Sequence, residues 1–312
     1  MLRSVFRCLV CLPVVCAALA VPAWAQILEP VPGSEWRSSW GGELSTLGIN
    51  ALVGGITAAV PQLRRGGRGD LVGRFARGAL GGSVGYAGKR LTVERWNGAG
   101  FLGRETSAVG ASMVSNAAQG RPLLSEVVLP LGPVRLYVRR TEALAVNARL
   151  DLAATAALAY TATRSDTRLD LGKSLSAGAP VFFTDSGEPV APEGHHAFGV
   201  VRVEGTRSEW DEQFERAATL FAHERVHTLQ HDLALQAWGA PAQRWLLARV
   251  PGGKTLDRYV DVGLHAILWA GLNAAVPYDD RPWEREAYFL SNRPADRPPP
   301  PHAPTGPAFS PR

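Results

Sequence analysis

The chain has 312 residues, of which 46% are hydrophobic and 20% are charged, and its formal net charge is +5 at pH 7. This composition is ordinary for a globular protein and is sufficient for one large or two modest domains with a sizeable core. The positive charges are scattered along the sequence and form no stripe, so nucleic acid is not an expected partner.

Residues 1–25 have the features of a signal peptide. Arg3 and Arg7 form a positive start, an apolar run follows from Leu9 to Val21, and Ala23-Trp24-Ala25 has the small-x-small pattern of a cleavage site. An uncleaved membrane anchor is disfavoured because the apolar run is shorter than a spanning helix needs. We therefore expect an exported protein that is periplasmic, envelope-associated or secreted.

The cysteines of the chain, Cys8, Cys11 and Cys16, all lie in this leader. The exported chain would contain none, so we expect neither a disulfide framework nor a thiolate metal site. Any metal ion would have to be bound by His, Asp or Glu side chains. Removal of the leader arginines would also lower the formal net charge from +5 to +3.

The next two regions differ in glycine content. Residues 26–46 contain Pro, Ser and Trp and are expected to form an irregular N-terminal arm. Residues 47–122 are rich in Gly and Ala, with glycines three and four positions apart, which predicts helices that approach each other closely. Such spacing also occurs in membranes, so association with a membrane surface is an alternative. We favour packed soluble helices, because the apolar runs are short and Arg74 and Arg77 interrupt one of them.

Residues 123–205 alternate apolar with small or polar side chains. Turn-forming residues such as Gly132-Pro133 and Asp185-Ser186-Gly187 separate these segments, which include ALAVNARLDLAATAALAYTATR. The pattern predicts an antiparallel sheet of about four to six strands. His195 and His196 in this region are interpreted as loop residues beside a turn. The expected fold class is therefore α+β.

Residues 206–292 return to a helical pattern. Ser208-Glu209-Trp210-Asp211 fits a capping box, and the helix that it starts is expected to end near Trp238, at Gly239 and Pro241. Further helices are predicted at Ala242–Val250, Leu256–Ala275 and Trp283–Leu290. The Pro-rich polar tail, residues 293–312, is expected to be disordered.

The first of these helices contains the pattern H-E-x-x-H at His223, Glu224 and His227. Because residues four apart on a helix lie one turn above each other, both imidazoles would face the same metal ion. Glu224 would face the same cleft and reach a water on that metal. This arrangement is the zincin signature, and it predicts a bound zinc ion.

A catalytic zinc ion normally has three protein ligands, so a third must come from elsewhere. His231 lies one turn further along the same straight helix, which places it too far from a metal bound by His223 and His227. His265 lies in an apolar helix and is interpreted as a core histidine. A histidine six residues after His227, as metzincins have, is absent because that position is Leu233. The remaining candidates are Glu284 and Glu286, which point to opposite sides of their helix, and we favour Glu284.

H-E-x-x-H followed by a helical E-x-x-A resembles the gluzincin arrangement, particularly that of CAAX-processing and related membrane peptidases. The extended form H-E-x-x-H-x-x-Q, with Gln230, is similar to that of uncharacterised exported bacterial zincin-like proteins. The resemblance covers the last third of the chain. It implies that Glu284 is the third zinc ligand and Ala287 the small residue one turn later. Tyr288 stands where the family has an aspartate that orients a ligand, so Asp232 or Asp261 would have to replace it.

These features predict an exported zinc metallopeptidase that hydrolyses a peptide or protein substrate. Glu224 would act as general base toward a water activated by zinc and would return the proton to the leaving amine. His265, Tyr278 and Tyr288 are candidate donors to the oxyanion. The alternative is a non-enzymatic cell-envelope or membrane-apposed scaffold with a structural or degenerate metal site.

Overall fold

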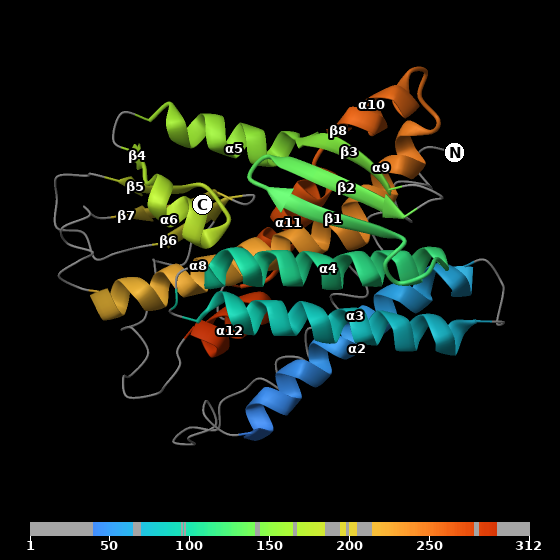
Figure 1. Cartoon of the computed structure of the whole chain (residues 1–312), viewed down its shortest axis with the longest axis horizontal. Coiled ribbons are helices and arrows are strands. Elements are labelled where there is room, and N and C mark those ends of the chain that lie inside the picture. The colour runs from blue at the N-terminus through green and yellow to red at the C-terminus, as the bar shows by residue number, and fades with distance from the viewer. Residues whose placement is uncertain are drawn as a thin grey trace, which may run out of the picture.

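The structure is a computed structural model that describes residues 40–64, 70–94, 96, 98–140, 144–164, 167–184, 194–197, 200–204, 214–277 and 281–291. The expected signal peptide, the capping box at Ser208 and the Pro-rich tail lie outside these residues. The described part combines helices with two small sheets, so the α+β class is confirmed (Figure 1).

The Gly/Ala-rich region forms α2 (Trp40–Arg64), α3 (Leu71–Thr92) and α4 (Ala99–Gln119), as predicted. Helix α2 starts within the region expected to be an irregular arm. The helices touch at glycines: a Cβ atom at Gly54 would lie 2.3 Å from the carbonyl oxygen of Gly78, and one at Gly88 would lie 2.4 Å from the backbone nitrogen of Ser107. Only glycine permits backbones to approach this closely.

Helix α2 also contains a stretch, Gly41–Gln62, that is long and apolar enough to span a membrane, although 39% of its 18-residue apolar window is buried within the structure. Partial burial of this kind is compatible with a helix in the core of a soluble protein.

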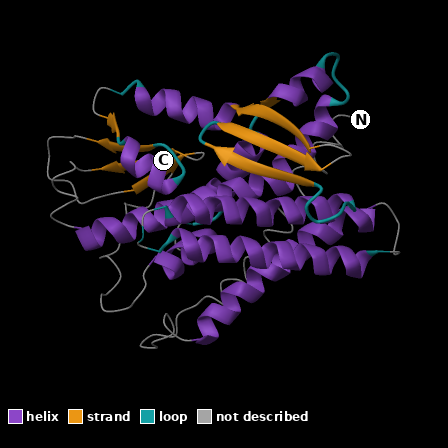
Figure 2. Cartoon of the chain, in the orientation of Figure 1, coloured by secondary structure: helices purple, strands orange, loops and turns teal. Residues whose placement is uncertain are grey.

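The strands form two mixed sheets, and the prediction of a single antiparallel sheet is wrong (Figure 2). The first sheet has the order β1-β2-β3-β8 and the second the order β4-β5-β7-β6. In each sheet one pair is parallel, β3 with β8 and β5 with β7. The strands are β1 (Glu126–Leu131), β2 (Val134–Arg140), β3 (Leu144–Asp151), β4 (Thr167–Leu169), β5 (Val181–Thr184), β6 (Gly194–Ala197), β7 (Val200–Glu204) and β8 (Val260–Asp261).

Two helices interrupt the region that was predicted as strands: α5 (Leu152–Ala162) and α6 (Leu171–Ala177). Each begins at an aspartate whose side chain accepts a backbone hydrogen bond, from Ala154 to Asp151 and from Lys173 to Asp170. Alanines lie between the larger residues of α5, a segment that was interpreted as part of a strand pattern, but the helix propensity of alanine and the aspartate cap favour a helix.

The C-terminal part is helical, with differences from the predicted boundaries. Helix α8 (Phe214–Ala234) continues through a π-helical turn, Leu235–Gly239, into α9 (Ala240–Leu247), so the predicted end near Trp238 is wrong. Pro241 lies in the first turn of α9, where a missing N–H is tolerated.

The predicted long helix from Leu256 to Ala275 is also divided. It forms α10 (Gly253–Tyr259), strand β8 and α11 (Leu264–Ala275). Strand β8 pairs with β3, and Gly263 with a φ of 78° starts α11. Helix α12 (Pro282–Ser291) matches the last predicted helix.

Helix α12 lies against α8, and α8 in turn contacts α3 and α4 (Figure 1). A cluster of buried apolar side chains joins these helices, formed by Tyr86, Val226, Ala287, Phe289 and Leu290. Ala287 is fully buried, which allows α12 to pack closely on α8. This packing brings the acidic residues of α12 next to the histidines of α8.

Candidate metal centre

His223 and His227 of α8 and Glu284 of α12 converge on one point. The two Nε2 atoms are 2.9 Å apart, and Oε2 of Glu284 lies 3.1 Å from Nε2 of His227 and 3.3 Å from that of His223. All these side chains are buried. The structure thus brings together the three residues that were predicted as metal ligands.

This donor set fits a divalent metal ion. With bonds of about 2.0–2.1 Å in a tetrahedral site, zinc ligands lie about 3.3 Å from one another. The observed separations of 2.9–3.3 Å are within about 0.4 Å of that value. Two imidazole nitrogens and a carboxylate oxygen converge here, and each can act as a metal ligand once it is deprotonated, so the buried group is able to bind a metal ion.

The ionisation of these groups reflects their proximity. Burial alone raises the pKa of Glu284, but hydrogen bonds with His223 and His227 outweigh it and keep the pKa below its usual range. Burial lowers the pKa of His223. The pKa of His227 rises to about 9, because Glu284 and Glu224 outweigh the opposite effect of burial. Metal binding would therefore displace a proton from His227.

Glu284 and Glu286 face different neighbours, which distinguishes the two candidates for the third ligand. Glu286 accepts hydrogen bonds from Nζ of Lys89 at 2.8 and 2.9 Å and from Nδ2 of Asn50 at 2.7 Å. Burial raises the pKa of Glu286, but the charge of Lys89 outweighs it and the net shift is downward. Glu286 is therefore an ionised carboxylate paired away from the histidines.

Gln230 lies within hydrogen-bond distance of His227. Its Oε1 lies 2.8 Å from Nδ1 of His227, and its Nε2 donates to Oε2 of Glu286 at 2.8 Å and to the carbonyl oxygen of Trp283 at 3.0 Å. The sequence contains this glutamine within the resemblance to zincin-like proteins, but its role as an orienting group was not predicted. Its position three residues after His227, on the same helix face, is the signal that could have suggested it.

The two aspartates proposed to orient a ligand have other roles, so that prediction is wrong. Asp232 forms ion pairs with Arg104 at 2.8 Å and with Arg135 at 2.9 Å. Asp261 accepts a hydrogen bond from the hydroxyl of Tyr137 at 2.9 Å. Buried arginines bind the carboxylate of Asp232, and a buried tyrosine binds that of Asp261. The sequence alone does not reveal these partners.

His223 has a different environment from His227. The ring of Tyr288 packs against its imidazole, with centroids 4.4 Å apart and an angle of 51° between the planes. Among the described residues, Nδ1 of His223 has no hydrogen-bond partner although it is buried. Tyr288, at the position where the sequence resemblance implies an aspartate, thus contacts His223 by ring packing.

Glu224, the predicted general base, is buried beside the ligands. Burial raises its pKa to about 7, with a further increase from Glu284 and an opposite effect from His227. A carboxylate with a pKa near neutrality is suited to accept a proton and return it at neutral pH. The ionisation of Glu224 therefore suits general-base chemistry.

The remaining candidate residues are two buried histidines, two histidines of the second sheet and Tyr278. His231 and His265 are buried and face each other, with Nε2 atoms 2.9 Å apart, so neither joins the metal group. His195 and His196 belong to strand β6, so their interpretation as loop residues is wrong. Tyr278, a candidate oxyanion donor, lies outside the described residues.

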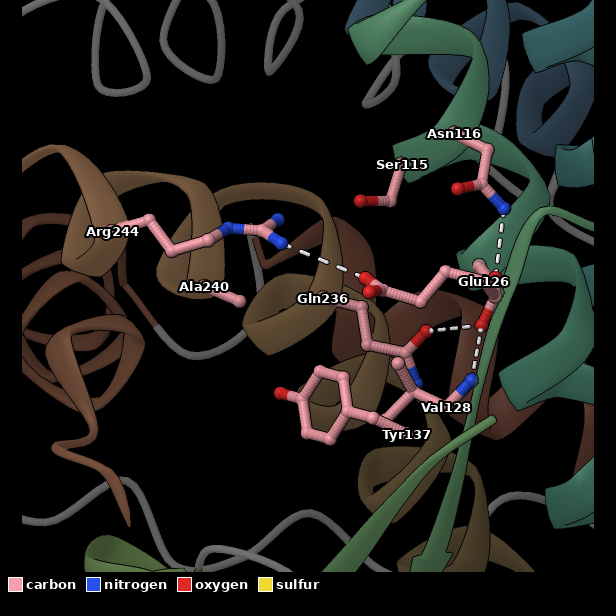
Figure 3. A pocket seen from close by; sticks show the side chains of 9 residues that line it. Ser115, Asn116, Glu126, Val128, Tyr137, Gln236, Ala240 and Arg244 are labelled. Atoms are coloured by element: carbon pink, nitrogen blue, oxygen red, sulfur yellow. Dashed lines mark hydrogen bonds and ion pairs between the residues drawn. The ribbon is translucent and has the colours of Figure 1, made fainter. Parts of the chain in front are cut away.

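A separate polar pocket lies between α4, the first sheet and the π-helical turn (Figure 3). Ser112 accepts a hydrogen bond from the backbone of Val128 and donates to Gln236, while Arg244 pairs with Glu126. The cavity volume is only about 10 Å³. This is the size of one water molecule, so the pocket is too small for an organic ligand.

Comparison of the chain with models of protein families, with curated proteins and with solved structures finds no match.

Proposed function

We propose that the chain is an exported zinc-dependent metallopeptidase of the zincin type. The observation that carries this proposal is the convergence of His223, His227 and Glu284, with Glu224 next to them on α8. The residues on α8 form the H-E-x-x-H motif, and Glu284 begins the E-x-x-A motif. The leader at residues 1–25 supports export.

Zinc at this site would supply a coordinated water of lowered pKa and would polarise a peptide carbonyl. Glu224 takes a proton from the attacking water and delivers it to the leaving amine. Its raised pKa of about 7 allows both transfers at neutral pH. The burial of Glu224 limits its contact with bulk water and strengthens its interactions with charge in the site.

A structural metal site in a non-enzymatic envelope protein is the second candidate, and one observation favours it. The exposed fractions of His223, His227 and Glu284 are only 5%, 7% and 8%. Structural zinc sites are closed, whereas catalytic sites keep one position open to water and substrate. A structural site would bind zinc without cleaving peptides.

Two measurements on the mature protein and its Glu224→Gln variant separate these functions. Elemental analysis should find about one zinc ion per chain in both proteins, because Glu224 is not a ligand. The wild type should cleave members of a general peptide library, and Glu224→Gln should lose this activity because an amide accepts no proton from water.

Each of the other outcomes has a definite meaning. Zinc without cleavage in the wild type would support the structural site. Cleavage that persists in Glu224→Gln would contradict the mechanism, and metal content near zero in the wild type would contradict both functions.

A further inference from the structure

We propose that Gln230, Glu286 and Lys89 form a positioning chain that fixes the metal-binding tautomer of His227. Through this chain the Gly-rich helix α3, which contains no metal ligand, would support the metal site. The inference rests on the proposed binding of zinc and adds the residues that prepare one ligand for it.

The first step is the orientation of the Gln230 amide. Its Nε2 faces two groups that can only accept, the carbonyl oxygen of Trp283 and the carboxylate of Glu286. A flipped amide would place its oxygen against both acceptors, so the observed orientation is the favourable one. The Oε1 atom is therefore directed at Nδ1 of His227, 2.8 Å away.

The second step is the tautomer of His227. Because Oε1 of Gln230 accepts, Nδ1 of His227 must donate and carries the proton. In the neutral imidazole, Nε2 then has a free lone pair. This atom faces Glu284 at 3.1 Å and His223 at 2.9 Å, where the metal would bind. The tautomer that Gln230 selects is thus the one that coordination by Nε2 requires.

The third step is the anchoring of Glu286. This carboxylate would be costly to bury alone, but Lys89 of α3 and Asn50 of α2 both donate to it. The side chains of Lys89 and Glu286 are 4% and 7% exposed, so the ion pair is shielded from water. With its charge compensated and its position fixed, Glu286 presents an acceptor to Gln230.

The chain also explains which glutamate of α12 faces the histidines. Residues two apart on a helix point in different directions, so Glu284 and Glu286 have separate partners. Lys89 pairs with Glu286 and keeps it on the α3 side of the helix. Glu284 is left as the acidic member of the metal group.

The test compares zinc affinities, measured by competition with a chromophoric chelator, of the wild type, Gln230→Met and Lys89→Met. Loss of a group that orients a ligand typically weakens metal affinity about 10–100-fold. We expect a loss of this size in Gln230→Met and a loss in the same direction in Lys89→Met. Gln230→Asn, which stays polar but is too short to reach both partners, provides a milder second variant.

Gln243→Met is the matched control. Gln243 is also a buried glutamine, and it donates to Asp257 and the carbonyl oxygen of Val260, away from the metal group. Its replacement should lower the stability of the fold and leave zinc affinity within about twofold of the wild type, since it touches no metal ligand.

A second measurement follows the tautomer directly. In the zinc-loaded wild type, nitrogen-15 NMR should show a slowly exchanging proton on Nδ1 of His227, because that proton is buried and hydrogen-bonded to Gln230. The proton should exchange faster in Gln230→Met. Unchanged zinc affinity together with unchanged exchange in the folded Gln230 variants would overturn the positioning chain alone. A wild type that binds no zinc would overturn the proposed function and this inference with it.

Discussion

Replacing Gly88 with alanine tests the account of how the Gly-rich helices pack. The added methyl group would lie 2.4 Å from the backbone nitrogen of Ser107 and 2.6 Å from the carbonyl oxygen of Gly103. Both neighbours are backbone atoms of α4 and have no rotamer to change. Helix α3 would have to move away from α4 by about 1 Å to restore contacts of about 3.5 Å.

The expected cost follows from two opposing effects. Overpacking of this kind typically costs about 1–3 kcal/mol, and rigid backbone neighbours favour the upper end. Alanine recovers up to about 1 kcal/mol of helix propensity. We therefore expect Gly88→Ala to lower the free energy of unfolding by about 2 kcal/mol.

Gly85 provides the matched control in the same helix. A Cβ atom there would meet no other atom within 4 Å, so only the propensity gain remains. Gly85→Ala should raise the free energy of unfolding by about 0.5–1 kcal/mol. Urea unfolding measures the change in the free energy of unfolding of both variants, provided that its slope with urea concentration is the same as in the wild type. If Gly88→Ala proved as stable as Gly85→Ala, the close packing of α3 on α4 would be refuted.

Three further predictions concern the buried charges and the metal. Asp232→Ala removes the carboxylate shared by Arg104 and Arg135 and should cost about 3–5 kcal/mol in urea unfolding; a cost below about 1 kcal/mol would contradict the ion-pair network. Burial lowers the pKa of His265 to about 4, whereas an unfolded histidine titrates near 6.5. The unfolded chain therefore gains a proton first as the pH falls, and the wild type should lose about 3 kcal/mol more stability than His265→Gln between pH 7 and pH 4. Equal pH profiles of the two proteins would contradict the burial of a neutral His265. Zinc at about 100 times its Kd should raise the free energy of unfolding by about 2.7 kcal/mol, and an unchanged Tm would contradict binding to the folded state.

The histidine pair was predictable because its geometry is local. The spacing of His223 and His227 places both imidazoles on one side of any helix. The choice of Glu284 over Glu286 came from the resemblance of Glu284 and Ala287 to an E-x-x-A motif, and the structure brings Glu284 to the histidines. Neither inference requires knowledge of the rest of the fold.

The groups around the metal site were not predictable in the same way. The ion pair between Lys89 and Glu286 joins residues 197 positions apart, and no periodicity relates them. Asp232 was a reasonable candidate from its position beside the motif, but buried arginines from α4 and β2 pair with it. Such partners are determined by the packing of whole elements.

The errors in secondary structure have a similar cause. The sequence of α5 was interpreted as part of a strand pattern, and the hydrogen bond from the backbone of Ala154 to Asp151 favours a helix instead. At Val260–Asp261, pairing with β3 interrupts an apolar stretch that would otherwise continue as a helix. Tertiary contacts and caps outweighed hydrophobic periodicity at both places.

The most direct test of the account is the zinc content and coordination of the purified mature protein, measured by elemental analysis and X-ray absorption. We expect about one zinc ion per chain, with two imidazole nitrogens and a carboxylate oxygen at about 2.0–2.2 Å. Glu284→Ala should lose the carboxylate ligand and most of the bound zinc. Negligible zinc in the wild type, or a full complement with unchanged coordination in Glu284→Ala, would contradict the assignment of this site.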